Sequence, residues 1–394
     1  MAKIMEHSDY VNIHPGTHVT RCILNNLGSP DDALKIIHVA GTNGKGSTAE
    51  FFTQILIAAG KKVGTFTSPA VYDFYDQFKI NGKPLSAEVA EKYFERAAEA
   101  ARGVRPTDFE IQTAGIILAF KEEGCEWAVI ECGMGGLNDA TNAINKKELA
   151  VITSLSLEHT EYLGNSIEEI CEQKAGIIKN CPAVVNGYQP FEAAEKYFKS
   201  IGGLFAHRLT YNGGNAFLYC DKEYELSLGC REQAYNAATA IEGAKILGLP
   251  EKAIYEGVKN TMLCGRVEIF TACGRRYILD GAHNPAAFGP LMKELSVLPV
   301  SQITLIFGCL KDKDIEGGLA ELSGGCNSVI ATECKSPRKM PLSDIEKACK
   351  RYFKNVSSAQ SVTEALDKAN TKTVVVCGSF TLLKEAKLWI EKRQ

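Results

Sequence analysis

A glycine-rich stretch, Gly41-Thr42-Asn43-Gly44-Lys45-Gly46-Ser47-Thr48, combines residue types that bind the phosphates of a nucleotide. Its glycines let successive backbone N–H groups turn toward one anion. Lys45 is placed to reach terminal phosphates, and the Ser47 hydroxyl can hold Mg²⁺. The stretch departs from the usual G-x-x-x-x-G-K-[ST] pattern, because Gly46 separates lysine from serine and Val39 stands where the first glycine is expected. We predict a phosphate-binding loop; a merely flexible glycine turn is the alternative.

Other candidate residues stand where predicted strands end. Glu131 follows the apolar run Trp127–Ile130, and Asp280 and His283 follow a strand that ends at Leu279. Open α/β sheets bind their ligands at the carboxyl ends of strands, so these side chains are expected at such an edge. The alternatives are a surface acid for Glu131 and an ordinary strand exit for the Asp280–Pro285 turn.

The elements around the loop predict a parallel α/β architecture. An apolar β-branched strand at 35–40 leads into the loop, helical spacing follows from Ser47 to Ala59, and a second strand covers Lys62 to Phe66. This strand, helix and strand order is a crossover unit. Further strands are predicted at 127–131, 150–154 and 183–186, with helices at 87–101, 113–123, 233–247 and 250–258.

A second, smaller α/β unit is predicted near the C-terminus. Its strands are expected at 276–279, 302–307, 328–331 and 373–377, and its helices at 285–295, 342–353 and 361–368. We place the domain boundary near 263–267. The expected organisation is a P-loop nucleotide-binding domain with a mostly parallel sheet at 1–264, and a Rossmann-like α/β domain at 265–394.

Composition excludes several classes of protein. The 394 residues are 45% hydrophobic and 23% charged, which suits large folded cores and argues against global disorder. A net charge of −3 gives no overall attraction to nucleic acid or to an anionic membrane. The fourteen cysteines are scattered without a C-x-x-C pair, which favours reduced core residues. With no predicted signal peptide or membrane span, we expect a cytoplasmic protein.

The loop resembles the nucleotide loop of the folylpolyglutamate synthase/dihydrofolate synthase family, within the Mur ligase superfamily. Further segments match this family in order along nearly the whole chain. They are Thr67-Ser68-Pro69, Phe109-Glu110, Glu131-Cys132-Gly133-Met134-Gly135-Gly136, Asp139-Ala140-Thr141-Asn142, Leu163-Gly164, Glu172 to Lys179, Gln233, Asn236-Ala237, Gly265-Arg266, Asp280 to Pro285, Phe307-Gly308 and Lys311 to Asp314.

The resemblance implies an ATP-dependent carboxylate–amine ligase. In the family, a substrate carboxylate attacks the γ-phosphate of ATP, and an amino group, usually that of glutamate, displaces the resulting acyl phosphate. Because the transferring phosphoryl group is anionic, such catalysis relies on metal ions, lysine and arginine. The implied acceptor is a folate or a dihydropteroate.

The resemblance also implies roles for individual residues. Thr42 to Thr48, Asn236, Arg266 and Asp280 would bind the nucleotide, clamped between the two domains. Ser47 would hold one Mg²⁺, and Ser68, Glu131 and His159 a second. Lys45, Lys174, Asp280 and His283 would be catalytic, with Lys174 carbamylated. From the residues alone, the simplest interpretations of His159 and Lys174 are a hydrogen-bonded structural histidine and an exposed salt-bridging lysine.

Departures from the family cluster where an acceptor would be recognised. They are Ala70, Val71, Asp76 and Gln77 after Thr67-Ser68-Pro69, Leu137 in place of an arginine, Glu158, Glu232, Leu263-Cys264, and the segment 12–19. Replacing arginine removes bidentate partners for carboxylates or phosphates. Two alternatives therefore stand beside a folate ligase: a divergent paralogue that uses another acid, and a catalytically inactive nucleotide-binding protein. We expect a monomer with small-molecule substrates only.

Overall fold

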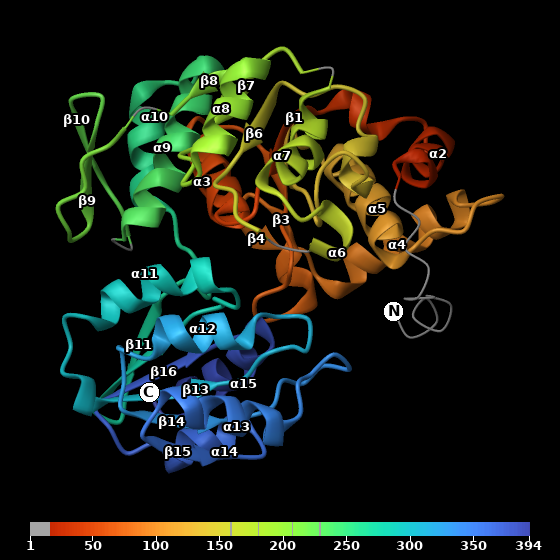
Figure 1. The fold of residues 1–394 in the computed structure, drawn as a ribbon. Helices are drawn as coiled ribbons and strands as arrows, with labels where there is room; N and C mark the ends of the chain where they lie inside the picture. The colour runs from red at the N-terminus through yellow and green to blue at the C-terminus, as the bar shows by residue number, and fades with distance from the viewer. Residues whose placement is uncertain (1–15, 158–159, 180, 207, 228–229) are drawn as a thin grey trace. The chain divides into compact units, whose positions relative to one another are not determined.

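The computed structural model describes the whole chain except residues 1–15, 158–159, 180, 207 and 228–229. The chain forms two compact units (Figure 1). The first comprises Met1–Pro69 and Tyr75–Met262, and the second comprises Ala70–Phe74 and Leu263–Gln394. The sequence predicts a division after residue 264. In the structure the first unit ends at Met262, and the segment Ala70–Phe74, from the first half of the chain, belongs to the second unit.

An eight-stranded sheet runs through the described part of the first unit, in the order β4-β3-β2-β5-β1-β6-β7-β8. Neighbours from β2 to β8 are parallel, and β3 and β4 add antiparallel pairs at one edge. A separate antiparallel hairpin joins β9 to β10. The strands are β1 Lys35–Ala40, β2 Val63–Phe66, β3 Phe78–Ile80, β4 Lys83–Pro84, β5 Trp127–Glu131, β6 Leu149–Ile152, β7 Val184–Asn186, β8 Leu204–Phe205, β9 Ala216–Tyr219 and β10 Lys222–Glu225.

Helices cover both faces of this sheet. Successive residues of a strand point to opposite faces. On β2, a Cβ at Gly64 would meet Phe120 of α5, whereas the next residue, Thr65, shares a 2.7 Å hydroxyl hydrogen bond with Thr53 of α3. Helices α3 and α5 therefore lie on opposite faces. The helices are α2 His18–Asn26, α3 Lys45–Ala58, α4 Ala87–Ala100, α5 Asp108–Glu122, α6 Thr160–Leu163, α7 Ile167–Ala175, α8 Glu192–Ile201, α9 Arg231–Ile246 and α10 Glu251–Asn260.

The second unit has a six-stranded sheet in the order β11-β12-β16-β13-β14-β15. Only the edge pair β11 and β12 is antiparallel among these described strands. Its elements are β11 Glu268–Ala272, β12 Arg275–Leu279, α11 Pro285–Leu295, β13 Ile303–Phe307, α12 Ile315–Leu322, β14 Ser328–Ala331, α13 Leu342–Tyr352, β15 Asn355–Ser358, α14 Val362–Lys368, β16 Thr373–Cys377 and α15 Phe380–Glu391. Both sheets confirm the predicted α/β class.

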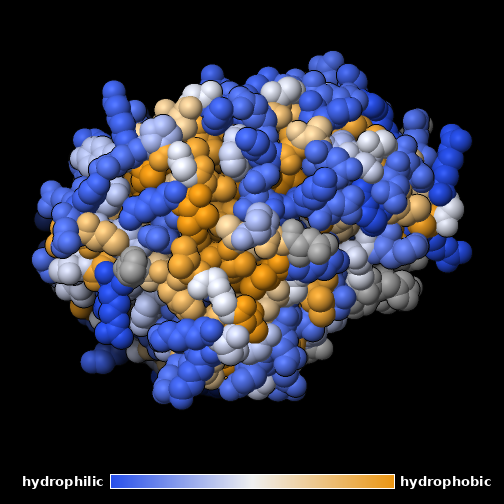
Figure 2. All heavy atoms as spheres, turned by 90° about the horizontal axis from the view of Figure 1, so that it is seen from above, coloured by the Kyte–Doolittle hydropathy of each residue, from blue (hydrophilic) through white to orange (hydrophobic). Residues whose placement is uncertain are grey.

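Apolar side chains gather across the middle of the face shown in Figure 2, and polar side chains surround them. Among the described residues, no helix is both long and apolar enough to cross a bilayer.

The prediction that the cysteines are core residues is partly wrong. All fourteen are free thiols, but Cys220, Cys264 and Cys273 are exposed. Cys220 and Cys273 lie in turns and have φ angles of 49° and 50°.

Candidate active site

The glycine-rich loop joins β1 to α3 through two positions that exclude a side chain. Gly41 has φ +143°, and a Cβ there would lie 1.9 Å from the Oγ1 atom of Thr153. Gly44, the residue before α3, has φ +87°, and its Cβ would lie 2.2 Å from the Oδ1 atom of Asn236. The backbone at both positions therefore requires glycine. The structure thus brings Asn236, from α9, directly against the loop.

The loop backbone is fixed at its start and leaves donors at its end. The carbonyl of Ser154 accepts hydrogen bonds from the Thr42 and Asn43 amides at 3.0 and 3.2 Å. The backbone amide groups that follow belong to Gly44 and to the first turn of α3. The first four N–H groups of a helix have no acceptor within that helix. The anion-binding part therefore begins at Gly44, where the positive end of the helix dipole adds to it.

Gly44→Ala tests this geometry. We expect a loss of unfolding free energy well above the ~1–2 kcal/mol of a left-handed alanine, because the Asn236 amide must also move. Gly60→Ala is the matched control, since Gly60 has φ +75° with no atom within 4 Å of its Cβ position. Denaturant unfolding measures both variants. Equal losses would show that Asn236 does not press on the loop.

The side chains of Lys45, the first residue of α3, and Glu131, the last residue of β5, form an ion pair. The Nζ atom of Lys45 donates to the Thr42 carbonyl at 3.2 Å and lies 3.9 Å from the Oε1 atom of Glu131. The other carboxylate oxygen of Glu131 accepts from the Ser68 amide at 3.1 Å. A Cβ at Gly46 would lie 3.1 Å from that same oxygen, so a side chain there would crowd the Glu131 carboxylate.

These residues fit one type of metal ion. Among the described residues, no group of three or more His, Cys, Asp and Glu side chains converges on a point. Glu131 is 4% exposed, and its carboxylate accepts from the Ser68 amide. The same carboxylate lies 3.1 Å from the Cβ position of Gly46, the residue directly before Ser47. Mg²⁺ takes oxygen ligands, usually one or two carboxylates together with phosphates and water. The donor set therefore fits Mg²⁺ carried with a phosphate. The predicted ligand His159 and the departure Glu158 lie outside the described residues.

Lys174 points inward, contrary to the simplest interpretation of its acidic neighbours. It is 1% exposed, and its Nζ atom donates to the Gly41 carbonyl at 2.8 Å. Helix α7, which carries it, begins with a capping box in which Ser166 and Glu169 exchange hydrogen bonds. The structure therefore brings Lys174 to the first glycine of the loop and uses one of the nearby glutamates as a helix cap.

A buried polar network supports this segment. Asp139 accepts from the Met134 and Thr141 amides at 2.8 and 2.9 Å, and burial raises the pKa of its carboxyl group. The amide of Asn142 donates at 3.1 Å to the carbonyls of Leu137 and Gly176. The Asp139-Ala140-Thr141-Asn142 segment therefore ties the turn after β5 to the end of α7, close to Lys174.

Lys147 completes the network and is a residue that the sequence analysis missed. Its Nζ atom donates to the side-chain oxygen of Asn142 at 2.6 Å and to the carbonyl of Ile177 at 2.8 Å, and it is 3% exposed. Burial lowers its pKa from 10.5 to about 8. A lysine beside an equally basic neighbour, Lys146, carries no sequence signal of burial.

The lowered pKa predicts a pH-dependent stability. Between pH 8 and 10.5 the unfolded chain holds the Lys147 proton and the folded protein has released it. Lys147 therefore raises the free energy of unfolding as pH rises through that window, by about 1.4 kcal/mol for each pH unit. The same contribution is lost as pH falls back through the window. Lys147→Met removes the gain. Urea unfolding at several pH values measures it, with exposed Lys146→Met as control. Parallel stability curves for wild type and Lys147→Met would contradict the assignment.

The candidates of the second unit gather near Phe380, the first residue of α15. Asp280 is 4% exposed and accepts from the Val267 and Ala282 amides at 2.8 and 2.6 Å. Burial raises the pKa of Asp280, and the Arg266 guanidinium opposes that rise. The Arg266 guanidinium carbon lies 4.8 Å from the centroid of the Phe380 ring, and the His283 ring centroid lies 6.1 Å from it.

His283 is oriented by its own turn. Its Nδ1 atom donates to the Gly281 carbonyl at 2.8 Å, which assigns the proton to that nitrogen. A Cβ at Gly281 would lie 2.1 Å from Phe380, so the backbone of the turn packs directly against the aromatic ring. Sequence reasoning missed Phe380, which stands three residues after the end of β16 and begins α15.

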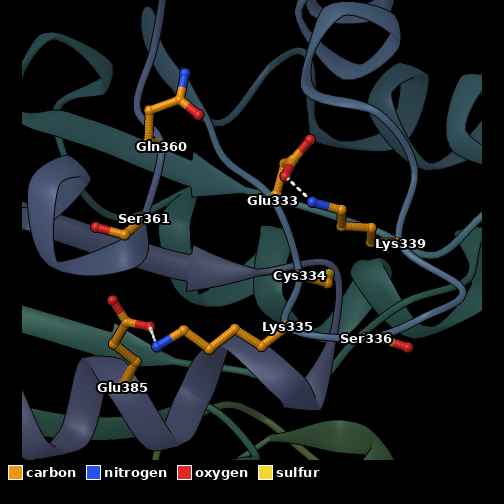
Figure 3. Close-up of a pocket in the computed structure, with 8 residues that line it drawn as sticks. All are labelled: Glu333, Cys334, Lys335, Ser336, Lys339, Gln360, Ser361 and Glu385. Carbon is orange, nitrogen blue, oxygen red and sulfur yellow. Dashed lines mark hydrogen bonds and ion pairs between the residues drawn. The ribbon is translucent and has the colours of Figure 1, made fainter.

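A separate pocket of about 250 Å³ opens on the second unit (Figure 3). The side chains that line it are Glu333, Cys334, Lys335, Ser336, Lys339, Gln360, Ser361 and Glu385. Lys339 pairs with Glu333, and Lys335 pairs with Glu385 at 2.6 Å, as the dashed lines in Figure 3 show. None of the predicted site residues lines this pocket.

The chain matches two protein-family models and is similar to curated proteins over most of its length. The Mur ligase middle domain matches residues 39–242, and the Mur ligase, glutamate ligase domain, matches residues 265–380. The dihydrofolate synthase/folylpolyglutamate synthase of Escherichia coli (strain K12) is 31% identical over 393 residues, covering 95% of this chain and 90% of that protein.

Solved structures are similar over nearly the full length. E. coli FolC in complex with DHPP and ADP matches with a TM-score of 0.89 and 29% identity, over 99% of this chain and 97% of that chain. A bifunctional folylpolyglutamate synthase/dihydrofolate synthase with Mn, AMPPNP and L-glutamate bound matches with a TM-score of 0.86 and 27% identity, over 99% of this chain and 98% of that chain.

Proposed function

The chain belongs to the folylpolyglutamate synthase/dihydrofolate synthase family of Mur ligases, and from that premise we propose that it joins L-glutamate to a folate or dihydropteroate carboxylate at the expense of ATP. The observation that carries the proposal is the loop at the start of α3, where Lys45, Glu131 and Ser68 converge. The E. coli structure with DHPP and ADP, and the structure with AMPPNP and L-glutamate, support the choice of substrates.

The chemistry follows from the groups at the loop. The acceptor carboxylate is a poor electrophile, so its oxygen first attacks the γ-phosphorus of ATP and ADP leaves. The amide groups from Gly44 onward and the Lys45 ammonium bind the phosphates and oppose the charge of the transferring group. A divalent ion held by Ser47, Ser68 and Glu131 would supply further charge neutralisation. The amino group of glutamate then displaces phosphate from the acyl carbon and forms the amide.

We assign the remaining predicted residues to the same reaction. Asn236 presses on Gly44 and so belongs with the nucleotide. Arg266, Asp280 and His283 carry the roles that the family resemblance implies, in binding the nucleotide and placing the amine. Their support in the second unit is the common contact of Arg266 and His283 with Phe380, together with the interaction between Arg266 and Asp280.

Carbamylation of Lys174 is part of the proposal. The side chain is almost fully buried, and Gly41 accepts one of its hydrogen bonds. A carbamate keeps one N–H group, which can still donate to Gly41, and turns the lysine end into an anion that can face a cation. With ¹³C-labelled bicarbonate, we expect a carbamate resonance in the NMR spectrum that is absent from Lys174→Gln. Identical spectra would leave Lys174 as a plain ammonium.

Release of ADP and phosphate tests the whole proposal. The protein is supplied with ATP, Mg²⁺ and glutamate together with dihydropteroate, tetrahydrofolate or no acceptor. We expect release that requires both glutamate and one of the two pterin acids. Amine-dependent release with other acids only would identify a divergent paralogue, which the exposed Leu137 at the place of the family arginine would suit. No release with any acceptor would identify an inactive nucleotide-binding protein.

A further inference from the structure

Two tyrosines stack on each other beside the loop, and nothing described so far uses them. The rings of Tyr188 and Tyr235 are 4.4 Å apart between centroids and 19° from parallel. Tyr188 follows β7, and Tyr235 lies on α9, elements that pack together in the first unit (Figure 1). Tyr188 is 46% exposed, so a large aromatic surface faces solvent.

One side of the stack is fixed to the loop through α9. Tyr235 directly precedes Asn236, whose amide lies against Gly44. Asn236 also donates from Nδ2 to the side chain of Gln233 at 3.0 Å, which holds the amide in place. Adjacent Cα atoms are about 3.8 Å apart, so the Tyr235 backbone is one residue from a contact with the phosphate-binding loop.

The other side is fixed through the residue after Tyr188. The Nε2 atom of Gln189 donates to the Thr153 carbonyl at 3.0 Å, and its Oε1 atom accepts from the Leu155 amide at 3.1 Å. These two residues flank Ser154, whose carbonyl anchors the start of the loop. Gln189 is 6% exposed, so this attachment is buried. Each tyrosine of the pair is therefore the sequence neighbour of a residue, Asn236 or Gln189, that contacts the loop or the segment that anchors it.

The inner tyrosine is also held from its far end. Arg231, one turn earlier on α9, donates from Nη2 to the Tyr235 hydroxyl at 3.4 Å, and its guanidinium carbon lies 5.7 Å from the ring centroid. Tyr235 is half-buried, and its ring supports that of Tyr188. A preordered flat surface loses little conformational freedom when a second flat group binds to it.

We propose that the outer face of Tyr188 stacks against the purine base of the nucleotide whose phosphates bind at Gly44–Thr48. In a nucleoside triphosphate, the ribose and base extend away from the phosphates. Tyr188 offers an exposed planar surface, and the next residue, Gln189, binds the segment that anchors the phosphate-binding loop. Aromatic side chains bind nucleobases by their π faces, and a bicyclic purine covers more of such a face than a pyrimidine. This inference rests on the proposed function, because it takes ATP as the substrate.

Calorimetric binding to the full chain in the presence of Mg²⁺ tests the inference, with ADP, CDP and inorganic tripolyphosphate as probes. We expect Tyr188→Ala to weaken ADP binding by about tenfold, which is the lower part of the range for base stacking. Tripolyphosphate has no base, so its affinity should not change. Tyr188→Phe keeps the ring and should bind ADP like wild type. Wild type should bind ADP more tightly than CDP, and Tyr188→Ala should reduce that preference.

Controls separate the possible failures. Tyr255→Ala removes another exposed tyrosine, on α10, and should leave every affinity unchanged. Unchanged ADP binding by Tyr188→Ala, or an equal loss for ADP and tripolyphosphate, would overturn the stacking inference while leaving the proposed function intact. A wild-type protein that binds neither ADP nor tripolyphosphate would instead contradict the proposed function itself.

Discussion

Lys45→Ala is expected to lower kcat for ligation by about three orders of magnitude, the upper part of the range for removing one preorganised group that stabilises transition-state charge. The Nζ atom of Lys45 is held by the Thr42 carbonyl and lies near Glu131, so it is placed before any phosphate arrives. Steady-state ADP release measures the loss. We expect folding to change little, because Glu131 keeps its hydrogen bond from the Ser68 amide.

The matched control for this variant is Lys61→Ala. Lys61 forms an exposed ion pair with Glu126 at 3.1 Å in the same unit, and such surface pairs contribute about 0–1 kcal/mol. This control should retain full activity. If Lys45→Ala unfolds at the same denaturant concentration as wild type and still turns over at the wild-type rate, the loop does not bind the reacting phosphates.

Glu131→Gln is expected to raise the Mg²⁺ concentration for half-maximal activity by at least about tenfold, the smaller of the effects seen when the support of a metal site is altered. Glutamine keeps the shape of the side chain and an oxygen for the Ser68 amide, but removes the charge that attracts a divalent cation. The measurement is a Mg²⁺ titration of ADP release at saturating ATP.

The control for the metal titration is Glu126→Gln, which removes an exposed carboxylate from the segment just before the same strand, β5. Its Mg²⁺ curve should match that of wild type. If the Glu131→Gln curve also matches, Glu131 positions Lys45 and the Ser68 backbone without binding a metal ion.

Local sequence patterns predicted the central elements well. The predicted strands at 35–40 and 127–131 are confirmed as β1 and β5 with the same bounds, because each is a short apolar run bounded by polar or glycine residues. The helix predicted from residue 113 begins at Asp108 instead. Its first turn is fixed by a capping box between Thr107 and Glu110, a polar signal that apolar periodicity does not count.

Edge elements were missed for physical reasons. Strand β15, Asn355–Ser358, lies at an edge of its sheet and alternates between exposed and partly buried residues, so it contains no apolar run. Strand β11 pairs antiparallel at the opposite edge of the same sheet and alternates in burial, so it lacks an apolar run. Ala70–Phe74 joins the second unit through long-range contacts, such as the 2.8 Å ion pair between Asp73 and Lys384, which sequence spacing does not reveal.

Some residues of the candidate site could be predicted from the local sequence, and others could not. The glycine-rich loop and Glu131 were identifiable because strand ends and glycine spacing are local features. The inward direction of Lys174 was not, since its acidic neighbours suggest an exposed side chain and only the packing of α7 brings it to Gly41. Lys147 and the Tyr188–Tyr235 stack depend on partners from distant segments, so no local pattern announces them.

Oxygen transfer from the acceptor to phosphate tests the central claim most directly. The acceptor acid is labelled with ¹⁸O in its reacting carboxylate and incubated with the protein, ATP, Mg²⁺ and glutamate, and the released phosphate is examined by mass spectrometry. If the carboxylate attacks the γ-phosphorus, one labelled oxygen leaves with the phosphate when the amine displaces it. Amide product formed together with unlabelled phosphate would contradict activation of the acid by phosphoryl transfer.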